Sequence, residues 1–159
     1  MIHGELVGIY MAQGKGQDLQ GVERVEALPG RGLVGDRYFL KEGTFSDRDG
    51  PDREVTLIEA EALEGLARDY EITLQPAQAR RNLLTRGVPL NHLVGRTFAI
   101  GPASLRGIRL CEPCGHLEKL TCKGVQKGLI HRGGLRAQIL TGGLLEVGAV
   151  ISMQTTSAQ

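Results

Sequence analysis

Short strand-like runs separated by glycine-containing turns constrain the fold of this chain most. Such runs cover residues 4–11, 22–28, 55–58, 82–85, 96–100, 103–110, 135–139 and 147–153. The chain of 159 residues contains 23 glycines, which is typical of tight turns and bends between short strands. Only residues 59–70 have helical periodicity, with one apolar face formed by Leu63, Leu66, Ala67 and Tyr70.

About seven strands with one main helix predict a mainly β fold of the β-rich α+β type. Strands in that number favour a closed or nearly closed barrel over an open sheet, because closure leaves no exposed edge. We expect a single domain over residues 1–153 and a disordered tail at 154–159. Residues 41–54 are polar and predict a long mobile loop, and residues 123–134 predict irregular structure.

The strand over residues 103–110 contains a change of phase. Ala103 and Leu105 share one parity, whereas Ile108 and Leu110 share the other, and Gly107 lies at the change. This pattern predicts a β-bulge at Gly107, which would re-aim the end of the strand and the residues that follow it.

Those following residues, Cys111-Glu112-Pro113-Cys114, are called the cysteine segment below. Basic residues flank it on both sides: Arg106, Arg109, Lys119, Lys123 and Lys127. Nearby positive charge favours the thiolate, and a short helix after Pro113 would add to the effect. We therefore predict sulfur chemistry or soft-metal binding, with Cys114 as the reactive thiol, and interpret Cys111 and Cys122 as small buried apolar residues.

Other assignments fit parts of the same segment. Cys111, Cys114, His116 and Cys122 have the donor types of a zinc site, which would make the protein a zinc-stabilised, non-catalytic binding module. Zinc is disfavoured because a second paired motif is missing, and a C-x-x-C redox pair lacks the usual βαβ surroundings. Gly30, Gly32 and Gly35 form a G-x-G-x-x-G pattern, but residues 36–39 show no helical periodicity, so a turning loop is favoured over a dinucleotide site.

Charge is distributed unevenly along the chain. Residues 1–71 carry 8 basic and 15 acidic side chains (net −7), and residues 72–159 carry 11 basic and 3 acidic ones (net +8). The basic half favours an anionic ligand near the cysteine segment, with the turn at residues 80–82 as a phosphate-binding candidate. The alternative is that the two halves attract each other.

Few aromatic residues and no basic helix stripe argue against nucleic acid. The sequence contains no long apolar run or signal peptide, and its odd cysteine count suits a reducing compartment, so we expect a cytoplasmic protein without membrane contact.

Six landmarks, in order and over most of the chain, resemble the MOSC family, which is named for the C-terminal domain of molybdenum cofactor sulfurases. The landmarks are residues 32–37, 55–58, 81–85, 93–101, 111–114 and 144–151. The resemblance implies a barrel similar to the pyruvate kinase β-barrel domain. It also implies binding of a molybdenum cofactor of the molybdopterin type, or handling of its sulfur. Cys114 matches the family's characteristic cysteine and would be the molybdenum ligand or persulfide carrier.

On this basis we expect Arg81, Asn82, Arg109 and Lys119 to hold the anionic parts of the cofactor. Gly35, Asp36 and Arg37 would shape the pocket wall. The alternative function that the resemblance implies is a molybdenum-dependent reductase of N-hydroxylated compounds. The sequence shows neither a desulfurase domain nor the N-terminal barrel of reductase relatives, so a sulfur-donor or electron-donor protein would be a partner.

Overall fold

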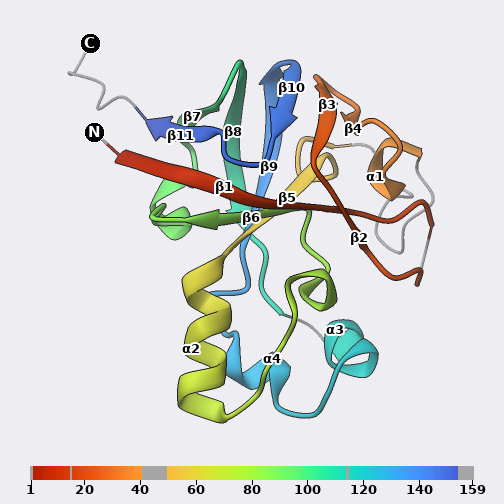
Figure 1. Cartoon of the computed structure of the whole chain (residues 1–159), viewed down its shortest axis with the longest axis vertical. Coiled ribbons are helices and arrows are strands. Elements are labelled where there is room, and N and C mark those ends of the chain that lie inside the picture. The colour runs from red at the N-terminus through yellow and green to blue at the C-terminus, as the bar shows by residue number, and fades with distance from the viewer. Residues whose placement is uncertain (1, 15, 41–49, 114, 154–159) are drawn as a thin grey trace.

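Seven strands form a closed barrel in this computed structural model, which describes residues 2–14, 16–40, 50–113 and 115–153 (Figure 1). The strand order is β11-β7-β8-β9-β5-β6-β1, and pairing of β11 with β1 closes the ring. Strands β5 and β6 are parallel, and the other neighbours are antiparallel. The barrel strands are β1 (Ile2–Met11), β5 (Val55–Glu59), β6 (Leu83–Arg86), β7 (Thr97–Ile100), β8 (Ala103–Leu110), β9 (Leu135–Thr141) and β11 (Val150–Met153). The predicted mainly β barrel is confirmed.

A smaller sheet of β10-β3-β4 lies beside the barrel. It contains β3 (Arg24–Leu28), β4 (Gly32–Leu33) and β10 (Gly143–Glu146), whereas β2 (Gln20–Val22) pairs with β1. The predicted strand at residues 22–28 is therefore divided between two sheets. Strand β10 was not predicted, because its glycine-rich start has the composition of a turn.

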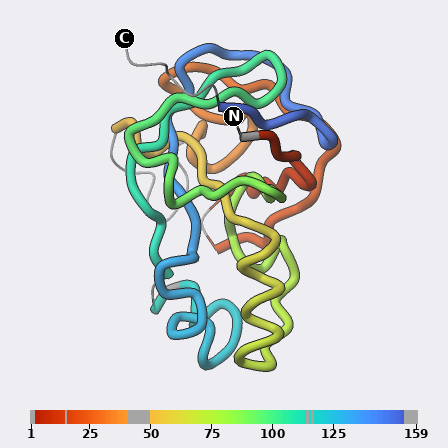
Figure 2. The backbone as a smooth tube through the Cα atoms, turned by 90° about the vertical axis from the view of Figure 1, so that its left-hand side faces the viewer, coloured from red at the N-terminus to blue at the C-terminus, as the bar shows by residue number. Residues whose placement is uncertain are grey.

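The helices gather mostly at one end of the barrel (Figures 1 and 2). They are α1 (Arg37–Leu40), α2 (Ala60–Tyr70), α3 (Gly115–Leu120), α4 (Val125–Gly128) and the 3-10 turns η1 (Pro76–Ala79) and η2 (Leu90–Leu93). Helix α4 lies within residues 123–134, so the expectation of irregular structure there is wrong in part. The one-turn helix α1 likewise contradicts the absence of helix expected for residues 36–39.

Two apolar cores stabilise this arrangement. Alternate residues of the strands, such as Leu105, Leu135 and Ala137, fill the barrel. Leu63 and Leu66 of α2 pack in a second core with residues of α3 and α4. Ala67 and Tyr70 are exposed, so the predicted helix face is wrong for these two. The helix buries its Ala62 side instead of continuing the face toward its C-terminal end.

Glu54 is a buried carboxyl that joins the two sheets. Its Oε1 accepts hydrogen bonds from Gly30 N (3.2 Å) and Ile139 N (3.0 Å). Burial raises the pKa of this carboxyl, and the two hydrogen bonds offset part of the rise.

The predicted tail at 154–159 and residues 41–49 of the predicted loop lie outside the described residues. No helix among the described residues is long and apolar enough to cross a membrane.

Candidate functional site

A register shift in β8 determines where the cysteine segment points. Leu105 pairs with Ile139 and Gly107 with Ala137, and all four are buried. After the shift Arg109 pairs with Arg136 and Leu110 with Leu135, so Leu110 takes the core-facing parity. Arg109 and the residue two positions on, Cys111, therefore lie on the outer face of the barrel. The predicted bulge at Gly107 is confirmed.

Gly107 is required at this position because another segment approaches it. A Cβ atom there would overlap the carbonyl oxygen of Leu93. The approach is fixed by hydrogen bonds from Gly107 N to Arg96 O (2.9 Å) and from Gly95 N to Gly107 O (2.8 Å). The bulge and the direction of the cysteine segment thus depend on residue 107 being a glycine, which has no Cβ atom.

The described part of the cysteine segment is held by backbone contacts. Cys111 N donates to Gly134 O (2.7 Å). Arg81 donates from Nη2 to Cys111 O (3.2 Å) and from Nε to Gly133 O (2.8 Å). Arg81 therefore connects the start of β6 to the cysteine segment and to the residues that precede β9. Cys114 itself lies outside the described residues.

Asn82, the neighbour of Arg81, is fully buried and makes its hydrogen bonds within the protein. Its side chain donates to Tyr10 O (3.1 Å) and accepts from the backbone N (3.1 Å) and the hydroxyl (3.2 Å) of Thr56. The Thr56 hydroxyl in turn accepts from Asn82 N (3.0 Å). These bonds join β1, β5 and β6, so Asn82 positions Arg81.

Arg136 is the residue of this site that sequence reasoning missed. It lies on β9 next to Arg109 and is only 8% exposed. Its Nη1 donates to the Tyr38 hydroxyl (3.3 Å) and to Asp52 O (3.2 Å). Nε has no partner, although it is buried. Burial lowers the pKa of the Arg136 guanidinium. Electrostatic attraction to Cys111, Tyr38 and Asp52, together with the hydrogen bond to Tyr38, raises this pKa by a larger amount, so the net shift is upward.

Helix α1 brings two more predicted residues to the same region. Asp36 is fully buried and accepts hydrogen bonds from Ala12 N (3.2 Å), Tyr38 N (3.2 Å) and Arg37 Nη1 (3.1 Å). Arg37 also donates from Nη2 to Arg80 O (3.1 Å), and its guanidinium lies 4.8 Å from the centre of the Tyr38 ring. Asp36 and Arg37 therefore fix α1 against β1 and the turn before β6.

Arg80 is a further basic residue held under constraint. Its backbone is left-handed, with φ of 59°, which is uncommon for a residue with a side chain. Its Nη1 donates to Gln17 O (2.7 Å). Burial, together with the charge of Arg37, lowers the pKa of the Arg80 guanidinium. Arg37, Arg80, Arg81 and Arg136 are called the arginine cluster below. Tyr38 contacts both Arg37 and Arg136, Arg37 bonds to the backbone of Arg80, and Arg81 follows Arg80 in the chain.

Arg109 of β8 and Lys119 of α3 are both exposed side chains. Arg109 donates from Nε to Asp52 Oδ2 (2.9 Å). Burial raises the pKa of Asp52, but the hydrogen bond from Arg109 and the charges of Arg53 and Arg109 produce a net lowering. Lys119 is an exposed residue of α3. Cys122 is also exposed, so the expectation that it is buried is wrong, whereas Cys111 is buried as expected.

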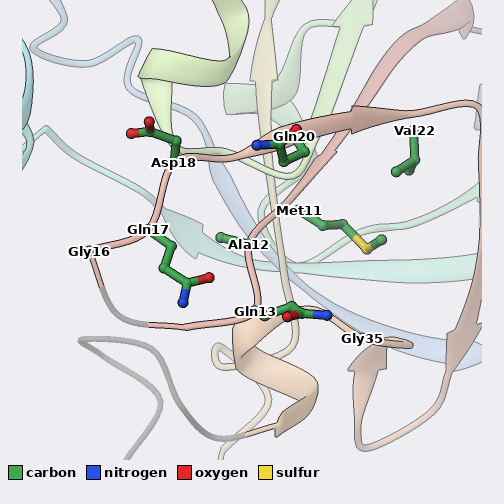
Figure 3. Close-up of a pocket in the computed structure, with 9 residues that line it drawn as sticks. All are labelled: Met11, Ala12, Gln13, Gly16, Gln17, Asp18, Gln20, Val22 and Gly35. Atoms are coloured by element: carbon green, nitrogen blue, oxygen red, sulfur yellow. The ribbon is translucent and has the colours of Figure 1, made fainter.

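A hollow of about 700 Å³ opens next to α1 (Figure 3). Gly35 forms part of its wall, together with Met11 and Val22 on the apolar side and three glutamine amides, Gln13, Gln17 and Gln20. A second hollow of about 470 Å³ is lined by Arg80, Gln78 and Leu120. Both share residues 16, 18 and 20, so the connection between β1 and β2 separates them.

The sequence model of the MOSC domain matches residues 46–152, about two thirds of the chain. The chain belongs to the MOSC domain family. The match includes the cysteine segment, Arg80, Arg81 and Arg136, but begins after α1. No protein among the curated sequences is significantly similar to the chain.

Solved structures share the fold of this MOSC protein at low sequence identity. YuaD from Bacillus subtilis superposes with a TM-score of 0.80 at 16% identity, covering 96% of this chain and 98% of that one. YiiM from Geobacillus stearothermophilus gives 0.72 at 16% identity, covering 95% and 75%. YiiM from Escherichia coli gives 0.68 at 20% identity, covering 100% and 72%. At these sequence identities the similarity shows a shared fold and nothing more.

Proposed function

We propose that this MOSC protein binds a molybdenum cofactor, or handles the sulfur of that cofactor, through Cys114. The observation that carries the proposal is the arginine cluster beside the cysteine segment. Arg37 bonds to the backbone of Arg80, Arg136 bonds to the Tyr38 hydroxyl, and Arg81 bonds to the backbone of Cys111. Asp36 is the one carboxylate that an ion pair links to these arginines among the described residues. A site with such an excess of positive charge favours an anionic ligand.

The residues present fit a phosphorylated, anionic cofactor. The buried Nε of Arg136 has no acceptor, and burial disfavours the charge on Arg80, so an anion would stabilise both. Arg80 and Arg136 would hold anionic groups, with Arg109 and Lys119 at the exposed rim. Arg81, Asn82, Asp36 and Arg37 would position these residues, and Gly35 would form the wall. The cofactor would supply a soft, redox-active metal, for which a thiolate is a suitable ligand.

Elemental analysis with sulfane-sulfur detection tests the proposal. Wild type, Cys114→Ser and the control Cys122→Ser are purified from molybdenum-replete cells. We expect molybdenum or cyanolysable sulfur in wild type and in Cys122→Ser, and a loss of at least tenfold in Cys114→Ser with an unchanged circular dichroism spectrum. Equal loading of all three proteins would contradict the role of Cys114. Stoichiometric zinc without molybdenum would instead support a zinc-stabilised binding module.

The hollow beside α1 favours a second candidate function, a molybdenum-dependent reductase of N-hydroxylated compounds. Its volume of about 700 Å³ lies within the range of small-molecule sites, and amide groups line it. Because this activity needs electrons, the assay combines the loaded protein with separate electron-donor proteins. Turnover that disappears in Gln17→Leu, with molybdenum content unchanged, would support this candidate over a pure carrier.

A further inference from the structure

We propose that Cys111 is a second sulfur-accepting thiol of this site, which takes sulfane sulfur from a low-molecular-weight persulfide beside Arg136. The proposal deepens the sulfur chemistry proposed for Cys114 and rests on it for the class of ligand. It concerns a different sulfur atom, so the two thiols can be scored separately.

The first support is the direction of the Cys111 side chain. Cys111 lies opposite Gly134 and two residues after Arg109, which pairs with Arg136. Residues at these positions share one face of the sheet, so Cys111 lies on the outer face with both arginines. It is buried, at 2% exposure, yet it belongs to neither apolar core. Its surroundings are therefore basic on this face, and not only apolar.

The second support is the state of Arg136. This side chain is more than nine-tenths buried, and it lies diagonally across the β8–β9 ladder from Cys111, because Arg136 pairs with Arg109 and Cys111 N bonds to Gly134 O. Its Nε is the buried side-chain nitrogen or oxygen without a hydrogen-bond partner among the described residues. A buried donor left unpaired destabilises the fold, so an anion at this position has a donor already in place. A persulfide anion on Cys111 is such an anion, and it would use this donor when no cofactor anion occupies it.

Asp52 contacts both arginines that share the outer face with Cys111. The backbone oxygen of Asp52 accepts from Arg136, and its carboxylate accepts from Arg109. The Arg109 side chain is 50% exposed and the Asp52 side chain 24% exposed, and ion pairs open to solvent contribute little to stability. In this proposal the segment around Asp52 covers the thiol, and local opening of that segment lets a small reagent reach Cys111.

The chemical step needs no external oxidant. The Cys111 thiolate attacks the terminal sulfur of R–S–SH, a sulfur–sulfur bond forms to Cys111, and the original sulfur–sulfur bond breaks. The products are Cys111–S–SH and R–S⁻, so one sulfane sulfur moves and the leaving thiolate carries the charge. The proton of Cys111–S–SH then passes to R–S⁻, which leaves as R–SH, and Arg136 stabilises the persulfide anion that remains on Cys111.

Loading is measured in a full-length protein with Cys114→Ser and Cys122→Ser, in which Cys111 is the remaining thiol. The probe is glutathione persulfide, and sulfane sulfur is followed by cyanolysis and peptide mass spectrometry. We expect close to one equivalent on Cys111, and none when Cys111→Ser is added. No loading of the native protein, under conditions that load its urea-unfolded form, would overturn the proposal.

Variants around Cys111 separate charge from access. Arg136→Met should slow loading about three- to tenfold, because the negative charge carried through the step loses the guanidinium beside it. Asp52→Ala should accelerate loading, because it removes a negative charge near the attacking sulfur and the hydrogen bond that holds the Asp52 segment to Arg109. Arg24→Met, an exposed residue of β3, should change nothing. If Arg136→Met does not fold by circular dichroism, Arg136→Lys, expected to fall between wild type and Met, replaces it.

The outcomes distinguish this proposal from the assignment of Cys114. Loading of Cys111 with no molybdenum or sulfur on Cys114 would sustain the further inference and reject the proposed function. Loading of Cys114 alone would do the reverse. A rate that is the same in Arg136→Met, Asp52→Ala and the parent protein would show that Cys111 is an ordinary thiol.

Discussion

Replacement of Gly107 by alanine tests how the barrel aims the cysteine segment. A Cβ atom on Gly107 would overlap Leu93 O and lie 2.8 Å from the Leu93 carbonyl carbon and 3.2 Å from Val94 N. These are backbone atoms, so no side-chain rotation relieves the overlap. The segment after η2 must therefore move away from β8, or β8 must change its register.

The expected loss of stability comes from two broken hydrogen bonds and from overpacking. Movement of that segment breaks the hydrogen bonds from Gly107 N to Arg96 O and from Gly95 N to Gly107 O. Each contributes about 0.5–1.5 kcal/mol, and overpacking adds about 1–3 kcal/mol. We therefore expect Gly107→Ala to lower the free energy of unfolding by about 2–6 kcal/mol.

Urea unfolding followed by circular dichroism measures this change. Gly115→Ala is a matched control, because a Cβ at Gly115 meets no atom within 4 Å. An alanine at the start of α3 should change stability by no more than about 1 kcal/mol. A loss for Gly107→Ala no larger than that of the control would refute the close approach, and with it the inferred direction of Cys111.

Three further substitutions test the surroundings of the site by the same unfolding assay. Asn82→Ala should cost about 2–5 kcal/mol, because it leaves buried partners unpaired; a loss under about 1 kcal/mol would contradict the network. Arg109→Gln should cost less than about 1 kcal/mol, as its ion pair with Asp52 is exposed. Burial raises the folded-state pKa of Glu54 above its unfolded value, so its contribution to stability is present at low pH and is lost as the pH rises through the folded-state pKa. Glu54→Gln should therefore gain stability relative to wild type as the pH rises above the ordinary glutamate pKa of 4.5; a difference that does not change with pH would contradict the shift.

The barrel could be predicted because each of its strands carries its own pattern. Alternation and the phase change at Gly107 are local properties, and they indicated both the strands and the bulge. Strands β4 and β10 contain only two and four residues, so they carry too little pattern to be recognised. Their pairing with β3 is fixed by tertiary contacts that no local window contains.

The candidate site could be predicted only where its residues follow one another in the chain. Alternation over residues 135–139 put Arg136 on the outer face, but its partner Tyr38 lies 98 positions earlier. Sequence alone does not reveal that contact, and so the buried guanidinium was missed. Arg81 and Asn82 were found as a polar turn, but their use in bracing β5, β6 and the cysteine segment needs the positions of Thr56 and Gly133.

The arginine cluster should also make the stability of the protein depend on anions, because a bound anion offsets the electrostatic cost of burying its guanidinium groups. Arg80 has a left-handed backbone and a charge disfavoured by burial and by Arg37, and Arg136 has an unpaired buried nitrogen. A bound anion offsets the electrostatic part of these costs, so it should stabilise the folded protein. Inorganic phosphate at about ten times its dissociation constant would add about 1.4 kcal/mol to the free energy of unfolding. We expect phosphate to raise the melting temperature above that in chloride of equal ionic strength, and Arg80→Met to abolish the difference. An equal rise in both salts would show that the cluster does not select an oxyanion.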